Sequence, residues 1–336
     1  MVQPKTMKMQ LIKKLQAAEL FNSSEHVVVA LSGGFDSLHL ATWLTDGSLP
    51  LTMQPKVSVI YINHQLRADA AEEEAFVREW LDQNKERFVH TAIQRMDWAE
   101  IPQHGIEEQA RERRYVLLKQ QALKWDTNII VTAHHQDDQV ETMLFKLLRG
   151  SHLQQLMGMS MRQIRDGLDL RRPFLGLSKA ELPKLVEKPI LKVIEDSSNY
   201  DQTYARNRLR QSIIPELKQI NHKFAPHLLK TMDQLGTLLK LADPILDAQA
   251  HEIEMGTFDW QAIEADVQIL VLQKWINQQQ EYEIKDQQLY QIIKLMQNPN
   301  VNRGSVQISH DLQAVRDKRQ LTLQKVINQS VLIDNS

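Results

Sequence analysis

The sequence predicts an α/β domain built on a parallel sheet, followed by a smaller, mainly helical domain with a terminal β-hairpin. Apolar runs alternate with helical stretches from about residue 26 to residue 150, which is typical of a parallel sheet covered by helices on both faces. Long helical periodicity returns at residue 213, and alternation of apolar and polar residues at 305–323 predicts the hairpin. We therefore expect domains at residues 1–212 and 213–336.

Polar residues follow directly after three of the predicted strands. The strands are predicted by apolar runs at residues 27–31, 57–62, 88–93 and 128–132. Ser32 follows the first run, Asn63 and His64 follow the second, and His134 and His135 follow the fourth. Ligands of such sheets bind beyond the carboxyl ends of the strands, so we expect these residues at one edge. Residues 153–189 are punctuated by Gly and Pro and predict irregular structure.

The segment after the first predicted strand has the features of a phosphate-binding loop. It consists of Ser32, Gly33, Gly34, Phe35, Asp36 and Ser37. Glycines let the backbone bring its N–H groups against an anion, and the helix that follows points its positive end at the same place. Asp36 would repel phosphate unless it holds Mg²⁺ or caps the helix. A plain Gly-Gly turn between strand and helix is the alternative.

Composition and missing motifs narrow the range of functions. The chain has 336 residues and no Cys, which excludes disulfides, thiolate metal ligands and a thiol nucleophile and fits a cytoplasmic location. Its apolar runs are too short to span a membrane. No Gly-x-x-x-x-Gly-Lys-Ser/Thr or Gly-x-Gly-x-x-Gly motif occurs, so two common nucleotide loops are excluded. Residues 160–230 carry 14 Lys and Arg against 8 Asp and Glu, which indicates an anionic partner or a solvated charged face.

Two histidines and two aspartates lie close together after the fourth predicted strand. They are His134, His135, Asp137 and Asp138. Carboxylates can bind Mg²⁺, and imidazole can position a substrate base. Acids in the first turn also stabilise a helix through its dipole, so both interpretations stay open.

Arginines gather in two further segments. Arg111 and Arg114 are three residues apart on a predicted helix and can reach a phosphate or a developing negative charge, unless they belong to a salt-bridged solvent face. Arg206, Arg208 and Arg210 follow an Asp-Ser-Ser-Asn loop at 196–199. They suit a phosphodiester backbone, or else form a linker with solubilising charge.

Taken in this order, the motifs resemble those of the bacterial tRNA(Ile)-lysidine synthetases, members of the PP-loop ATP pyrophosphatases with an adenine nucleotide alpha hydrolase-like, Rossmann-like fold. The motifs are Ser-Gly-Gly-Phe-Asp-Ser at 32–37, Asn-His-Gln-Leu-Arg at 63–67, Glu-Gln-Ala-Arg-Glu-Arg-Arg-Tyr at 108–115, Ala-His-His-Gln-Asp-Asp-Gln-Val-Glu-Thr at 133–142, Leu-Arg-Gly-Ser at 148–151, Arg-Pro-Phe-Leu at 172–175, Asp-Ser-Ser-Asn at 196–199 and Arg-Asn-Arg at 206–208. They cover about residues 26–210, and the resemblance is weaker after residue 213.

The resemblance implies an activity. The family uses ATP and Mg²⁺ to adenylate the C2 oxygen of the wobble cytidine in tRNA(Ile) with a CAU anticodon. Free L-lysine then attacks C2 through its ε-amine, which releases AMP and leaves lysidine. The expected partners are therefore this tRNA and L-lysine, with no membrane, and family analogy also implies a homodimer.

The resemblance also implies roles for particular residues. Cofactor binding falls to Ser32, Gly33, Gly34, Phe35, Asp36, Ser37 and His64. The expected catalytic residues are Asp36, Arg111, Arg114, His134, Asp138 and Arg206. Asp36 and Asp138 are the expected Mg²⁺ ligands.

Two other functions compete with this interpretation. A PP-loop amide synthetase, such as an NAD or GMP synthetase, would adenylate a carboxylate or carbonyl and use ammonia, but it does not require the Arg-Asn-Arg motif at 206–208. A non-catalytic tRNA- or nucleotide-binding protein would not need the intact Ser-Gly-Gly-x-Asp-Ser loop or the doubled His and Asp. The absence of Cys argues against a tRNA thiolase.

Overall fold

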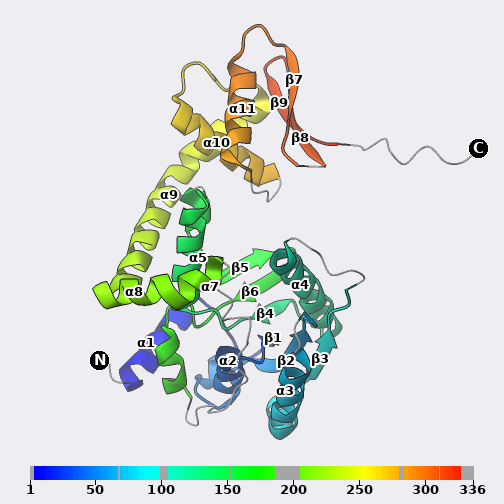
Figure 1. The fold of residues 1–336 in the computed structure, drawn as a ribbon, viewed down its shortest axis with the longest axis vertical. Coiled ribbons are helices and arrows are strands. Elements are labelled where there is room, and N and C mark those ends of the chain that lie inside the picture. The colour runs from blue at the N-terminus through cyan, green and yellow to red at the C-terminus, as the bar shows by residue number, and fades with distance from the viewer. Residues whose placement is uncertain are drawn as a thin grey trace, which may run out of the picture. The chain divides into compact units, whose positions relative to one another are not determined.

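The computed structural model describes residues 4–66, 69–98, 105–151, 153–186, 205–279, 284–309 and 311–326 (Figure 1). The chain divides into two compact units, Met1–Asp233 and Gln234–Ser336. The division falls inside the long helix α9 (Phe224–Met255). The expected domain boundary after residue 212 stays a prediction.

A six-stranded sheet in the order β3-β2-β1-β4-β6-β5 organises the first unit. Its strands are β1 (His26–Leu31), β2 (Lys56–Asn63), β3 (Thr91–Arg95), β4 (Ile129–Val131), β5 (Arg162–Arg165) and β6 (Leu168–Arg171). All neighbours pair in parallel except β5, which runs antiparallel to β6 at the edge. The parallel sheet that the sequence predicts is therefore confirmed.

The β5–β6 hairpin lies in the segment that the sequence predicts to be irregular. Its two turn residues, Asp166 and Gly167, have φ of 52° and 79°. Positive φ at both positions is what a two-residue hairpin turn of type I′ requires. Each strand has only four residues, and β5 reads Arg-Gln-Ile-Arg, which hides the alternation by which strands are recognised.

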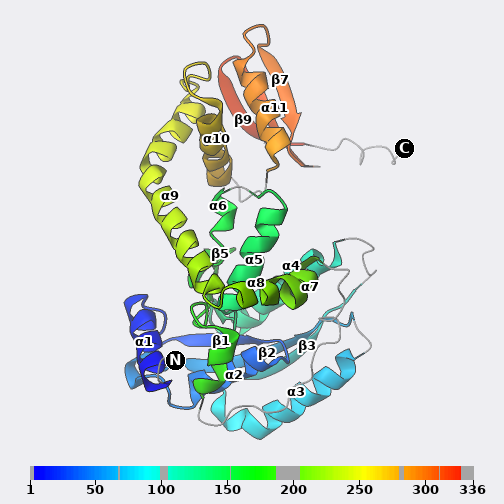
Figure 2. The ribbon, with the colours of Figure 1, turned by 60° about the vertical axis from the view of Figure 1, so that its left-hand side comes forward.

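Helices cover both faces of the sheet. The helices of this unit are α1 (Pro4–Ala17), α2 (Phe35–Thr45), α3 (Ala70–Asn84), α4 (Ile106–Lys124), α5 (Gln136–Leu148), α6 (Leu153–Leu156), α7 (Ala205–Arg208) and α8 (Ile214–Ile220), with short 3₁₀ turns η1 (Leu51–Met53), η2 (Lys85–Arg87) and η3 (Lys179–Lys184) and a π-helical turn η5 (Leu209–Ile213). Val27 and Val29 of β1 pack with α1, α2 and α3, whereas Val28 packs against α4 on the opposite face (Figure 2). Successive residues of a strand point to opposite faces, so a fully apolar run is what a doubly covered sheet needs.

The second unit is mainly helical and ends in a small sheet. The end of α9 packs with α10 (Ala265–Gln279) and α11 (Asp286–Gln297) around buried side chains such as Leu272, Trp275 and Ile292. β7 (Arg303–Gln307), β8 (Leu312–Asp317) and β9 (Gln320–Lys325) form an antiparallel sheet in sequence order. The predicted hairpin is confirmed, and a third strand extends it.

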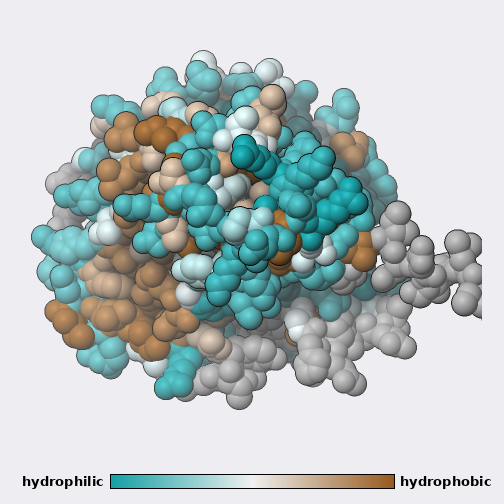
Figure 3. Space-filling model, turned by 90° about the horizontal axis from the view of Figure 1, so that it is seen from above, coloured by the Kyte–Doolittle hydropathy of each residue, from teal (hydrophilic) through white to brown (hydrophobic). Residues whose placement is uncertain are grey.

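The surface of the molecule is mixed in character. In the view of Figure 3 most of the face is hydrophilic, and hydrophobic side chains gather on one part of it. In α9, Leu238, Leu241 and Ile245 are 61%, 70% and 65% exposed. Among the helices that the structure describes, none combines the length and the apolar character that crossing a membrane requires.

Candidate active site

The loop between β1 and α2 has the backbone of an anion-binding turn. Gly33 has φ of 72°, and a Cβ at this position would lie 2.5 Å from Oε1 of Glu73, so glycine is required on two grounds. Ser37 Oγ donates to the carbonyl of Gly34 at 3.0 Å and accepts the N–H of Ser32 at 3.0 Å, which closes the loop. The N–H groups at the start of α2 are left for a ligand.

Asp36, in the first turn of α2, is surrounded by cations. Its Oδ2 lies 3.4 Å from Nε2 of His135 and 3.6 Å from Nζ of Lys179. Burial by itself raises the pKa of Asp36, but the bond to His135 and the charge of Lys179 outweigh it, and the pKa lies below its usual value. Within the described residues, the buried Oδ1 of Asp36 has no hydrogen-bond partner. Asp36 is therefore an ionised carboxylate with one oxygen available to a ligand.

His135 lies between two of the predicted site carboxylates. It is the N-cap of α5 and is 5% exposed. Its Nε2 faces Asp36, and its Nδ1 lies 3.4 Å from Oδ2 of Asp138, which also accepts the His135 backbone N–H at 2.8 Å. Burial lowers the pKa of His135. The bond to Asp36 and the charge of Asp138 raise this pKa by more than burial lowers it, so it lies above its usual value. The imidazole thus joins α2 to α5.

The other acid of this turn, Asp137, points toward two lysines. Its Oδ2 accepts the backbone N–H of Lys179 at 2.9 Å, and its Oδ1 forms an ion pair with Lys218 of α8. Burial raises the pKa of Asp137, but these bonds lower it more. In Asp138 burial prevails, and its pKa lies above the usual value. The two neighbouring acids therefore have opposite shifts.

The predicted magnesium ligands, Asp36 and Asp138, are close together but do not form a complete metal site. Within the described residues, no group of three or more His, Cys, Asp or Glu is arranged to hold a metal ion. The imidazole of His135 lies between the two carboxylates, so both can bind one ion only if it moves aside. The unpartnered oxygen of Asp36 does fit Mg²⁺, which commonly takes one or two carboxylates and completes its shell with water and substrate phosphate.

Cationic side chains surround His134. Its Nδ1 lies 2.8 Å from Oγ1 of Thr132. Burial lowers the pKa of His134 to about 3, and the nearby charges of Arg172 and Arg114 act in the same direction. His134 is therefore a neutral imidazole beside guanidinium groups, and Arg111 of α4 adds a third. This arrangement suits an anionic ligand.

A cavity of about 180 Å³ opens at the carboxyl ends of β1 and β2. Ser32 of the loop, His64 after β2 and Arg114 of α4 all line it. The structure therefore brings together three residues that the sequence placed in separate motifs. The cavity lies at the sheet edge where the sequence predicts that the nucleotide binds.

Arg206 of α7 packs against a later turn of α5. Its guanidinium stacks over the ring of Phe145 at 4.8 Å, and in the described residues its buried Nε has no hydrogen-bond partner. The neighbouring Arg210 forms an ion pair with Glu141 at 2.7 Å. Phe145 follows Asp138 by about two helical turns, roughly 10 Å. Arg206 therefore lies beyond the carboxylate cluster formed by Asp36, Asp137 and Asp138. The loop at 196–199 lies outside the described residues.

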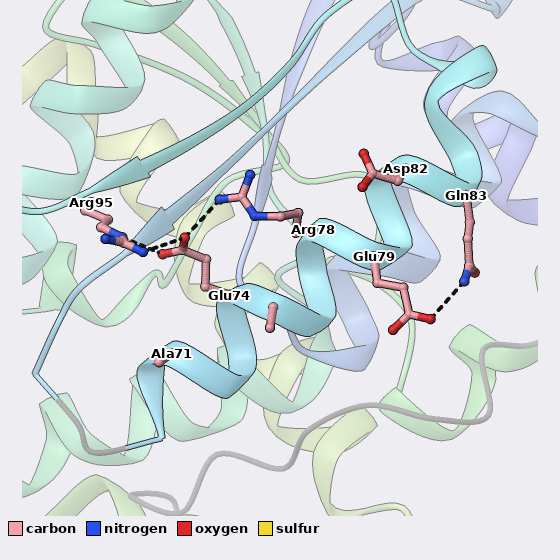
Figure 4. Close-up of a pocket in the computed structure, with 8 residues that line it drawn as sticks. Ala71, Glu74, Arg78, Glu79, Asp82, Gln83 and Arg95 are labelled. Carbon is pink, nitrogen blue, oxygen red and sulfur yellow. Dashed lines mark hydrogen bonds and ion pairs between the residues drawn. The ribbon is translucent and has the colours of Figure 1, made fainter.

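A larger, open hollow of about 690 Å³ lies over α3 and β3 (Figure 4). It is lined by Ala71, Glu74, Ala75, Arg78, Glu79, Asp82, Gln83 and Arg95. None of the residues that the sequence predicts for the site lies there. The smaller cavity beside Ser32 is therefore the better candidate for the chemistry.

Sequence reasoning missed three cationic side chains of the site. Lys179 and Lys218 reach Asp36 and Asp137 from segments far along the chain, and no local pattern marks them. Arg172 begins the Arg-Pro-Phe-Leu motif at 172–175, but no sequence pattern indicates that it is 2% exposed and close to His134.

Comparisons with known proteins show the family of this chain. A family described as the PP-loop domain matches residues 5–217. The tRNA(Ile)-lysidine synthase of Lactiplantibacillus plantarum is 30% identical over 309 residues, which cover 89% of this chain and 67% of that protein. The enzyme of the same name from Streptococcus pyogenes serotype M3 is 29% identical over 329 residues, covering 96% and 71%.

A solved structure shares the fold. The U34-tRNA thiolase NcsA from Methanococcus maripaludis matches with a TM-score of 0.54 and 13% identity, over 69% of this chain and 78% of that one. At this identity the likeness concerns the fold alone. From the family match and the relatives above, the chain belongs to the tRNA(Ile)-lysidine synthase family of PP-loop enzymes, ATP-using ligases that form a carbon–nitrogen bond.

Proposed function

We propose that this chain joins L-lysine to C2 of the wobble cytidine in tRNA(Ile) with a CAU anticodon, in the cytoplasm, using ATP and Mg²⁺. The observation that carries the proposal is the meeting of three motifs at one sheet edge. The β1–α2 loop, the His135 and Asp138 cluster and Arg114 of α4 surround the ends of β1, β2 and β4. A PP-loop enzyme needs a phosphate site and groups for an attacking nucleophile at that edge.

In the first step, the cytidine O2 attacks the α-phosphorus of ATP, and the bond to pyrophosphate breaks. The loop N–H groups and the ammonium of Lys179 hold the departing pyrophosphate. Arg111 and Arg114 neutralise negative charge on the phosphoryl group. Mg²⁺, when bound, would screen phosphate charge, and the buried, unpartnered Oδ1 of Asp36 would be its protein ligand.

In the second step, the lysine ε-amine attacks C2, the bond from C2 to the adenylated oxygen breaks, and AMP leaves. The amine must lose a proton, so a carboxylate of the cluster has to accept it. Asp138 suits this role best, because burial raises its pKa while Asp36 and Asp137 are held ionised by cations. Neutral His134 can accept or donate a hydrogen bond to the base.

The tRNA is held by the basic segment at the start of α7. Arg206 places positive charge beside Phe145 of α5, beyond Asp138, while Arg210 pairs with Glu141. Phosphate contacts of this type orient a nucleic acid without reading its bases. A wobble base turned out of the anticodon loop can then enter the site. Family analogy also implies a homodimer, which sedimentation of the purified protein would test.

The test is pyrophosphate release from ATP by purified protein, with L-lysine and unmodified CAU-anticodon tRNA(Ile) each present or omitted. The proposal predicts release that depends on this tRNA and is lost in Asp36→Ala, while tRNA affinity stays within a few-fold. Release that ignores the tRNA but responds to a small carboxylate would identify an amide synthetase instead. No release under any condition would favour a non-catalytic binding protein.

A further inference from the structure

The side-chain amide of Asn63 makes three hydrogen bonds at the turn that follows β2. Asn63 Nδ2 donates to the carbonyl of Ala70 and to Oε2 of Glu74, each at 3.0 Å. Its Oδ1 accepts the N–H of Gln65 at 2.9 Å. Gln65 has φ of 56°, an uncommon conformation for a residue with a side chain. The Asn63 amide therefore stabilises a turn that would be unfavourable without it.

Glu74 of α3 helps to fix which way that amide points. A carboxylate and a carbonyl can only accept hydrogen bonds, so Glu74 and Ala70 both require the NH₂ of Asn63, and the amide oxygen faces Gln65. If position 74 presents a donor instead, one of the two acceptors that hold this NH₂ is lost. Glu74 is 4% exposed, so water does not substitute for it.

Arginines fix the orientation of the Glu74 carboxylate in turn. Arg95 donates from Nε to Oε2 at 2.9 Å and from its terminal nitrogen to Oε1 at 3.0 Å (Figure 4). Arg78 donates to the same Oε1 at 3.0 Å. A two-point contact from a rigid guanidinium leaves the carboxylate one orientation.

His64, the middle residue of the 63–65 turn, is also held by a hydrogen bond. The indole N–H of Trp98 donates to the carbonyl of His64 at 2.7 Å, and Arg113 of α4 stacks over the Trp98 ring at 4.6 Å. Asn63, His64 and Gln65 line the cavity beside the β1–α2 loop, whereas Glu74 lines the outer hollow behind them. Glu74 thus supports the cavity lining from behind without contacting the ligand.

We propose that Glu74, oriented by Arg95, is a positioning residue for the nucleotide. It holds the 63–65 turn in the conformation that lines the nucleotide cavity, so it sets ATP affinity rather than the rate of the later chemical steps. This inference rests on the proposed function, in which that cavity receives ATP. A charge pair that served stability alone would leave ATP affinity unchanged.

The test is Glu74→Gln, compared with Glu79→Gln on the same helix. Glu79 also lines the outer hollow, but its carboxylate accepts a hydrogen bond from Gln83 of the same helix at 3.1 Å. We expect Glu74→Gln to weaken binding of a non-hydrolysable ATP analogue by about tenfold, or about 1.4 kcal/mol. KM for ATP rises in parallel, while kcat at saturating ATP stays within about twofold. Glu79→Gln leaves both constants unchanged.

Arg95→Gln provides a second variant in case Glu74→Gln fails to fold. The Arg95 side chain is 64% exposed, so its loss is tolerated by the core. Arg95→Gln should weaken ATP binding less than Glu74→Gln does. The double variant should lose no more ATP affinity than Glu74→Gln alone, because both residues act through one network. Unchanged ATP affinity in folded Glu74→Gln, or a loss of kcat alone, would overturn the inference.

Analogue binding needs neither tRNA nor lysine. If the nucleic-acid substrate is not tRNA(Ile), the proposed function is refuted, but the effect of Glu74→Gln on binding of the ATP analogue is unchanged. Conversely, normal ATP affinity in Glu74→Gln with intact lysidine formation would refute the positioning role alone.

Discussion

Replacing Lys179 with alanine should lower kcat/KM for ATP by about 10- to 100-fold. Its ammonium lies 3.6 Å from Oδ2 of Asp36, where the proposed pyrophosphate group would be held. Two unit charges at this separation interact by about 1 kcal/mol in water and by about 5 kcal/mol at an effective dielectric of 20. The Lys179 side chain is 62% exposed, so screening favours the lower part of this range, about 1.4 to 2.8 kcal/mol.

The assay is the initial rate of pyrophosphate release at low ATP with saturating tRNA and lysine. Lys184→Ala is the matched control, because Lys184 is an exposed residue of the same η3 turn. Lys179→Arg should keep much of the activity, since it retains the charge. A rate within about twofold of the parent in Lys179→Ala would refute the assignment of this ammonium to pyrophosphate.

Three further predictions concern stability, each measured by urea unfolding. Gly33→Ala should cost about 1–3 kcal/mol because φ is 72° and Glu73 lies 2.5 Å from the new Cβ; an unchanged midpoint would contradict this. Arg171→Met should cost about 3–5 kcal/mol, since the 1% exposed guanidinium pairs with the buried Asp169 and with Glu25 and its loss leaves Asp169 without that partner; a cost below about 1 kcal/mol would argue against it. The bond to Arg95 lowers the pKa of Glu74 to about 2, so this carboxylate stabilises the fold above its unfolded pKa of about 4.5 and the contribution is lost as pH falls toward 2. The parent should therefore lose more stability than Glu74→Gln between pH 5 and about 2.5, and equal losses would contradict the assignment.

The parallel strands of the first unit could be predicted because their burial on both faces leaves a continuous apolar run. Val27 and Val29 pack on one face of the sheet and Val28 on the other, and β4 (Ile129–Val131) is likewise a short, wholly apolar segment. The third strand begins at Thr91 rather than at Phe88, because the N–H of Phe88 closes the turn η2 by donating to the carbonyl of Lys85 at 3.1 Å. The apolar run at 88–93 gives no sign of this turn.

The site was predictable where function requires particular residues next to a strand end. Ser32, Asp36 and His135 belong to turns whose sequence order carries the information. Glu74 and Lys179 could not be found in that way, because each acts through contacts with distant segments. Glu72, Glu73 and Glu74 are consecutive in the sequence, and only the contact with Asn63 distinguishes Glu74 from its neighbours.

The most direct test of the account is to follow labelled L-lysine into RNA. Purified protein, ATP and Mg²⁺ are incubated with unmodified CAU-anticodon tRNA(Ile) or with a CAU-anticodon methionine tRNA, and digested nucleosides are separated by mass. The account predicts lysidine in the isoleucine tRNA, one AMP and one pyrophosphate per modified cytidine, and none of these in Asp36→Ala. Nucleotide turnover without lysine in the RNA would contradict it.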